Sequence, residues 1–220
     1  MRSDRINQRY DRQHNVDTWR CLTVKELQTS SSNFALSERY IPTPELTFHA
    51  LLSVLAADYK DYSFIDFGSG KGKVLLMASR YPFTSITGVD FAGNLHAIAE
   101  KNIHRVKQNN QLQCDNIQVV LGEAEKLPLP TGKCFFFLYA PFFGAALEST
   151  LESIRASLTQ SPRAAIICFI DDDVPGSLVN EAAERIASWG ICSEILLPVL
   201  PKDAAAVWPI RATCWRSSPS

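Results

Sequence analysis

The chain has 220 residues, of which 46% are hydrophobic, 10% aromatic and 20% charged. This length corresponds to one domain, and the composition excludes wholesale disorder, collagen and a small disulfide scaffold. With 22 basic and 23 acidic residues the formal net charge is −1, so no overall positive field would attract nucleic acid or an anionic membrane, although a local basic patch stays open.

Residues 1–40 form a polar segment that differs from the rest of the chain. They are rich in Arg, Asp, Asn, Gln and Ser, and the charged start lacks the apolar core of a secretory signal. Tyr10, Trp19, Leu22 and Leu27 give the segment more apolar surface than a disordered tail carries. We expect an ordered N-terminal arm over residues 1–40, able to act as a lid, followed by one domain over residues 41–220.

From residue 41 onward, predicted helices and strands alternate. Thr43 and Pro44 form a helix start, because a hydroxyl N-cap precedes a proline at the first helical position. Apolar runs predict strands over 63–67, 85–91, 117–121, 133–139 and 164–170, and apolar periodicity predicts helices over 71–81, 94–106, 145–158 and 178–188.

Two final extended segments, 191–197 and 204–214, have no helix between them and are expected to pair antiparallel. The whole pattern predicts an α/β fold, a doubly wound and mostly parallel seven-stranded sheet with a C-terminal antiparallel strand pair. The longest apolar run, 134–147, is interrupted by Pro141 and Gly144, whereas a membrane-spanning helix needs about 20 apolar residues. Six cysteines without zinc-ligand spacing are expected to be reduced thiols of a cytoplasmic protein.

The loop after the first strand carries the most informative pattern, Asp66-x-Gly68-x-Gly70-x-Gly72. Ligands of open α/β sheets bind outside the carboxyl ends of the strands, and glycines allow close approach of the backbone. The P-loop pattern is absent, and Lys73 stands where a dinucleotide motif has its third glycine. A carboxylate before the first glycine suits a cofactor with an ammonium and a sulfonium better than it suits a pyrophosphate.

Further candidate groups follow the next strands at the same predicted edge. Asp90 ends the second strand, 24 residues after Asp66, where a carboxylate can accept both hydrogen bonds of a ribose diol. Glu123 and Ala124 follow the third strand, where they would border an adenine. Tyr139 ends the fourth strand.

These motifs resemble those of class I S-adenosylmethionine-dependent methyltransferases, over about residues 40–215. The resemblance implies a Rossmann-like fold and S-adenosylmethionine as cofactor, with S-adenosylhomocysteine as product. More narrowly, the string 40–44, the string 66–73, and the pattern that runs from Gly88 to Asn102 resemble bacterial proteins distantly similar to Dot1-like protein lysine methyltransferases.

The resemblance also implies a role for each site residue. Asp66, Gly68, Gly70 and Gly72 would hold the methionine part of the cofactor, Asp90 the ribose, and Glu123 and Ala124 the adenine. Ser69, Phe91 and Tyr139 would be further cofactor contacts, and Tyr139, Pro141 and Phe142 would wall the transfer site. Thr43 and His14 are candidate substrate contacts. Many amine methyltransferases of this class have Asn or Asp where this chain has Ala140, whose side chain cannot bind a target nitrogen.

Simpler structural explanations stand beside these roles. The glycines can be turn residues, Asp90 a helix cap, Glu123 a solvated acid, and Tyr139 and Phe142 core aromatics. We expect Lys71 and Lys73 to be solvated, with a contact between Lys71 and the cofactor carboxylate as the alternative for Lys71. The run 171–173 of three aspartates is assigned to capping, and we expect no metal.

The predicted function is methyl transfer from S-adenosylmethionine to an unidentified acceptor, a protein side chain or a small molecule. Nucleic acid is not favoured as a partner, because the chain has no net positive charge. Two alternatives stay open: a catalytically lapsed S-adenosylmethionine-binding partner or sensor, and an NAD(P)-dependent oxidoreductase.

Overall fold

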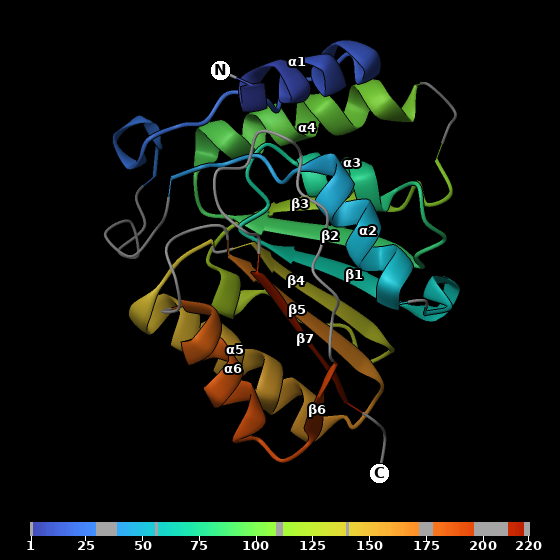
Figure 1. Cartoon of the computed structure of the whole chain (residues 1–220), viewed down its shortest axis with the longest axis vertical. Coiled ribbons are helices and arrows are strands. Elements are labelled where there is room, and N and C mark those ends of the chain that lie inside the picture. The colour runs from blue at the N-terminus through green and yellow to red at the C-terminus, as the bar shows by residue number, and fades with distance from the viewer. Residues whose placement is uncertain are drawn as a thin grey trace.

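The structure, a computed structural model, describes residues 2–29, 39–55, 57–108, 112–139, 141–171, 178–195 and 211–217. Its centre is one sheet of seven strands in the order β3-β2-β1-β4-β5-β7-β6 (Figure 1). The strands are β1 (Ser63–Phe67), β2 (Ser85–Asp90), β3 (Ile117–Leu121), β4 (Cys134–Tyr139), β5 (Ala165–Asp171), β6 (Cys192–Ile195) and β7 (Arg211–Ser217). Strands β1 to β5 pair in parallel, and β7 pairs antiparallel with β5 and β6. The predicted fold class is confirmed.

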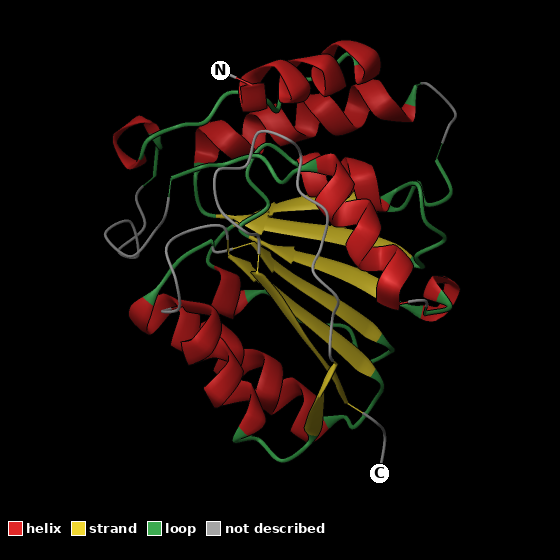
Figure 2. Ribbon diagram, in the orientation of Figure 1, coloured by secondary structure: helices red, strands yellow, loops and turns green. Residues whose placement is uncertain are grey.

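Helices cover both faces of this sheet, as a sheet of buried parallel strands requires. Figure 2 shows α5 and α6 on one face and α1 to α4 on the other. The helices are α1 (Arg2–His14), α2 (Glu45–Leu55), α3 (Lys73–Ala78), α4 (Gly93–Lys107), α5 (Gly144–Gln160) and α6 (Leu178–Ala187), with short 3-10 turns η1 (Val24–Glu26), η3 (Tyr59–Asp61) and η4 (Ala124–Lys126). No helix within the described ranges is both long and apolar enough to cross a bilayer.

Strand β4 explains how one apolar run serves two cores. Successive side chains of a strand point to opposite faces, so Phe135 and Phe137 join the core that contains α2 and α3. Phe136 and Leu138 join the core that contains α5 and α6. All four side chains have no exposed surface, which fixes β4 at the middle of the sheet beside β1.

Most predicted elements differ from the structure by one or two residues at an end, and two of the differences have a clear physical cause. Helix α3 begins at Lys73, not at residue 71, because Gly72 adopts the left-handed conformation with φ 80°. The last strand ends at Ser217, not at residue 214, since β5 pairs with it as far as Ser217. The first part of that prediction, 204–210, lies outside the described residues. The Ser217 hydroxyl donates to the Arg163 carbonyl and accepts from the Ala165 amide, which anchors that end of the strand pair.

The N-terminal arm is ordered where the structure describes it, and it begins with the unpredicted helix α1. Asn7, Tyr10 and Asp11 form the buried face of α1, with the i, i+3, i+4 spacing of one helix side. The Nζ atom of Lys73 donates to Asn7 Oδ1 at 2.7 Å and lies 4.9 Å from the Tyr10 ring centroid. Farther along, Leu22 and Tyr40 form an antiparallel bridge.

Candidate functional site

A pocket opens at the carboxyl ends of β1, β2 and β4, where the strand order reverses between β1 and β4. Doubly wound sheets bind ligands at such a point. The pocket holds about 1160 Å³ of space, counted out to its open mouth. Eleven of the predicted site residues line it, namely Thr43, Asp66, Gly68, Ser69, Asp90, Phe91, Glu123, Ala124, Tyr139, Pro141 and Phe142.

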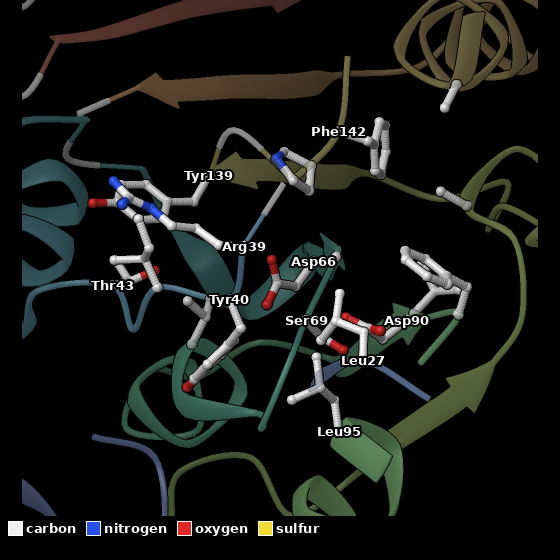
Figure 3. Close-up of a pocket in the computed structure, with 18 of the residues that line it drawn as sticks. Leu27, Arg39, Tyr40, Thr43, Asp66, Ser69, Asp90, Leu95, Tyr139 and Phe142 are labelled. Atoms are coloured by element: carbon white, nitrogen blue, oxygen red, sulfur yellow. The ribbon is translucent and has the colours of Figure 1, made fainter. Parts of the chain in front are cut away.

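Asp66 lies near the middle of the labelled side chains of this pocket (Figure 3). It sits one residue before the end of β1 and is only 2% exposed. Within the described part of the chain, its Oδ2 atom has no hydrogen-bond partner. Burial, and then the charge of Asp90, raise the pKa of the Asp66 carboxyl well above its usual value. A buried carboxylate oxygen without a hydrogen-bond partner is stabilised either by a nearby cation or by a bound proton.

The three glycines of the loop all have positive φ values: 77° at Gly68, 54° at Gly70 and 80° at Gly72. A Cβ atom on Gly68 would lie 2.3 Å from the Pro141 Cβ. One on Gly70 would lie 2.4 Å from Cε2 of Tyr40. Both positions therefore need glycine for space as well as for conformation. Gly68 borders the pocket directly, whereas Gly70 and Gly72 do not line it.

Asp90 joins the glycine loop to the end of β2. Its Oδ2 atom accepts from the Gly70 amide and its Oδ1 atom from the Ala92 amide, each at 2.8 Å. Its pKa is raised to about 6, because the effect of burial exceeds the opposing effect of the two backbone hydrogen bonds. Ala92 is the N-cap residue of α4, so the carboxylate does help to shape the helix start. Each oxygen keeps a further lone pair for a ligand hydroxyl.

The far side of the pocket is built from the loops after β3 and β4. Glu123 is the N-cap residue of η4, and Ala124 is buried in the core that also contains Phe142. Phe142 is 6% exposed and lines the pocket, so it is a core aromatic that also borders the site. Tyr139 is partly exposed at the end of β4.

The wall opposite comes from the N-terminal arm and the segment after it. The sequence predicted the arm as a possible lid, but Thr43 was the one residue of this wall that it named. We call Leu27 with residues 39–43 the arm wall; Leu27, Arg39, Tyr40, Ile41, Pro42 and Thr43 all line the pocket. The Tyr40 hydroxyl donates to the Thr18 carbonyl at 2.8 Å, which holds its ring against Gly70. Two features of the sequence could have indicated this wall, namely the apolar content of residues 1–40 and the string 40–44.

Lys71 and Asn102 clamp the arm to the glycine loop. Lys71 Nζ lies 3.0 Å from Asp17 Oδ1. The Asn102 amide accepts from the Asp17 amide and donates to the Asp17 and Lys71 carbonyls. The prediction that Lys71 and Lys73 are solvated is wrong, since each is 2% exposed. Their partners lie on the arm, more than fifty residues away in sequence.

The structure places His14 away from the pocket. Its ring lies 2.8 Å from the Arg80 guanidinium and packs on Tyr10. Burial, and then the Arg80 charge, lower the pKa of His14. Ala140 and two members of the aspartate run, 172–173, lie outside the described residues. Among the residues that are described, no three His, Cys, Asp or Glu side chains gather as metal ligands do.

Comparison with known proteins places this pocket in a wider context. A family model described as "Methyltransferase domain" matches residues 65–154, the stretch from β1 into α5. No curated protein matches the chain.

Solved structures are similar over most of the chain at low sequence identity. The precorrin-6y C5,15-methyltransferase of Geobacter metallireducens GS-15 matches with a TM-score of 0.53 and 16% identity, over 89% of this chain and 95% of that one. A SAM-dependent methyltransferase from Aquifex aeolicus gives 0.54 and 16%, over 79% and 90%. The magnesium protoporphyrin IX methyltransferase of Synechocystis PCC 6803, with bound SAM, gives 0.56 and 11%, over 79% of each chain. The fold is therefore the Rossmann-like methyltransferase fold, and residues 65–154 match a methyltransferase domain.

Proposed function

We propose that this protein transfers a methyl group from S-adenosylmethionine to an acceptor. The observation that carries the proposal is the unpartnered, buried Oδ2 atom of Asp66 in a pocket at the sheet's switch point. The donor chemistry of the pocket fits the cofactor, because Asp66 offers a carboxylate to a cation and Asp90 offers acceptors to hydroxyl groups. The methyltransferase-domain match over residues 65–154 supports the same assignment.

Each wall of the pocket has a distinct task in this proposal. Asp66, Gly68 and Ser69 hold the methionine part of the cofactor. Gly70 does not line the pocket, but its hydrogen bond to Asp90 holds the loop in position. Asp90 binds the ribose, with Phe91 beside it. Glu123 and Ala124 border the adenine. When bound, the cofactor supplies a methyl group activated by its sulfonium, which transfers by in-line displacement.

The chain's own contribution is alignment and the exclusion of water. Tyr139, Pro141 and Phe142 line the side of the pocket formed by the loop after β4, and Thr43 lines the arm wall. Groups held in this way bring donor and acceptor into one geometry, which can lower a barrier by roughly 7–11 kcal/mol in favourable cases. We propose a small molecule or a protein side chain as the acceptor. Two structural neighbours are named for precorrin-6y and magnesium protoporphyrin IX, which supports the small-molecule class.

Calorimetric titration with S-adenosylhomocysteine tests the cofactor assignment. We expect binding that weakens about tenfold or more in Asp90→Ala, because hydrogen bonds to a charged group contribute roughly 1.5–3 kcal/mol. Asp115→Ala is the matched control, since Asp115 is an exposed acid before β3 and should bind as the unmodified protein does. No binding at millimolar ligand would refute the proposal, and tight NADH binding instead would favour the oxidoreductase.

Turnover needs its own experiment, because a lapsed binding protein would pass the calorimetric test. We expect labelled methyl groups from S-adenosylmethionine to appear in components of a cell extract, and Asp66→Asn to reduce the incorporation. Binding without any incorporation would support the sensor alternative. Fractionating the labelled product by size separates a protein acceptor from a small molecule.

A proton-linkage measurement tests the role of Asp66 directly. A bound cation lowers the pKa of a carboxyl that burial has raised, so binding should release protons as Asp66 ionises. The heat of S-adenosylmethionine binding at pH 7 should then differ between buffers of different ionisation enthalpy. Asp66→Asn should remove most of this difference. A difference that persists unchanged in Asp66→Asn would contradict the role.

A further inference from the structure

The outward face of α1 carries a row of arginines. Arg5, Arg9 and Arg12 are all exposed, and they lie on the side of the helix opposite the buried Asn7, Tyr10 and Asp11. Within the described residues, none of the three arginines has an ion pair or a hydrogen bond. With a rise of about 1.5 Å per residue, they stand about 6 Å and 4.5 Å apart along the axis. The row is a local positive field on a chain whose net charge is −1.

An open hollow containing an aromatic ring adjoins this row. It is lined by Gln8, Asp11, Arg12, Asn15, Val16, Asp17 and Trp19. Arg12 therefore belongs to both features. The two carboxylates in the hollow are already engaged, since Asp11 accepts from Thr18 and Trp19 and Asp17 pairs with Lys71. What remains for a ligand is a half-buried indole, an amide group at Gln8 and at Asn15, and a guanidinium.

The backbone that carries Trp19 is anchored before any ligand arrives. Asp11 Oδ2 accepts from the Trp19 amide at 2.9 Å and from the Thr18 amide at 2.6 Å, and Thr18 in turn accepts from the Tyr40 hydroxyl. A partly exposed aromatic side chain on an anchored backbone, beside a line of cations, is the arrangement that single-stranded nucleic acids bind, with a base stacked on the ring and phosphates on the cations. A membrane surface is less suitable, because the exposed face of α1 carries arginines where interfacial helices insert apolar side chains.

We propose that the arginine row and the Trp19 hollow together bind single-stranded nucleic acid. An unpaired base stacks on Trp19, Gln8 and Asn15 offer hydrogen bonds to its edge, and Arg5, Arg9 and Arg12 contact the phosphates. This inference goes beyond the proposed methyl transfer and does not depend on it, because binding can be measured without cofactor. The net charge of −1 does not favour nucleic acid as a partner, whereas the local positive charge on α1 does.

The test is fluorescence anisotropy of a labelled twelve-nucleotide single strand, as RNA and as DNA, titrated with the full chain. We expect the logarithm of the binding constant to fall with the logarithm of salt concentration with a slope of about −2, as three phosphate contacts predict. Arg5→Gln/Arg9→Gln/Arg12→Gln should weaken binding about tenfold or more at low salt. The matched control is Lys60→Gln/Lys133→Gln/Arg155→Gln, which removes the same charge from exposed positions elsewhere and should bind as the unmodified chain does.

The hollow has a separate readout. Trp19→Ala should weaken single-strand binding about fivefold or more, whereas Trp19→Phe, which keeps a ring, should lose less. Circular dichroism melting confirms that each variant is folded. Equal binding by the two triple variants would overturn the arginine assignment. Equal affinity for duplex and single strand, with no effect of Trp19→Ala, would overturn the single-strand assignment, and binding to phosphatidylserine vesicles but not to oligonucleotides would point to a membrane instead.

Discussion

The two walls of the pocket are built by different means. The sheet wall consists of strand ends and the loops that follow them, so backbone topology brings Asp66, Asp90 and Tyr139 to one edge. The arm wall depends on side-chain bonds between segments far apart in sequence, such as the pair between Lys71 and Asp17. The strand-end side of this pocket therefore follows from the fold, whereas the opposite side depends on a few individual contacts.

Gly68→Ala should lower the free energy of unfolding most, because Gly68 lies in the sheet wall at a point where both the backbone conformation and the space for a side chain are restricted. A left-handed φ costs about 1–3 kcal/mol for a residue with a Cβ, and the 2.3 Å approach to Pro141 adds about 1–3 kcal/mol of overpacking. We expect the free energy of unfolding in urea to fall by about 4 kcal/mol. Gly132→Ala is the control, since a Cβ there meets nothing within 4 Å; equal losses in the two variants would contradict this view.

Asn102→Ala should be the most damaging change to the arm contacts. The side chain is fully buried and makes three hydrogen bonds to Asp17 and Lys71, so at about 1 kcal/mol each the loss is about 3 kcal/mol. Limited proteolysis should also cut the arm earlier. Asn94→Ala removes two exposed bonds to the arm from the same helix and should cost less. A smaller effect at Asn102 than at Asn94 would reverse our ranking of the two contacts.

Asp66→Asn should change how stability depends on pH. The native pKa of Asp66 is raised above its unfolded value, so the native state keeps the proton longer than the unfolded state does. Stability therefore declines as pH rises through that window, by up to about 1.4 kcal/mol per pH unit for one proton. Urea unfolding from pH 4 to pH 8 should show a flatter profile in Asp66→Asn than in the unmodified protein. Asp115→Asn serves as control, and an unchanged slope in Asp66→Asn would argue against a raised pKa.

Tyr40→Phe should give the smallest effect of the four. It removes only the hydroxyl bond to the Thr18 carbonyl, which is worth about 1 kcal/mol, and leaves the ring over Gly70. Tyr62→Phe is the matched control, because the described residues give the Tyr62 hydroxyl no hydrogen bond. The melting temperature of Tyr40→Phe should be lower than that of Tyr62→Phe. The opposite order would show that the Tyr40 hydroxyl does not stabilise the arm.

Most of the sheet could be predicted from the sequence, and the reason is local. Strands β1 and β3 have the predicted bounds, because their apolar runs end at turn residues. The start of α3 was missed by two residues, since the φ of Gly72 is set by the turn and not by helical periodicity. The end of the last strand was predicted three residues too early, because that end depends on pairing with β5.

The candidate site also has a part that could be predicted from the sequence and a part that could not. Residues at strand ends were found because a parallel sheet collects them at one edge. The burial of Lys71 and Lys73 could not be predicted, since lysine at a helix start is ordinarily solvated and the residues that cover them lie on α1 and the segment after it. His14 was chosen for its place in a polar arm, but α1 directs it to Arg80 instead.

The seat of the Tyr40 ring on Gly70 determines where this protein can be divided. A chimera that contained only residues 41–220 would keep every strand of the sheet. It would lack Tyr40, however, and so would leave an unfilled space beside Gly70. Anyone grafting this pocket onto another protein should therefore take the first forty residues with it.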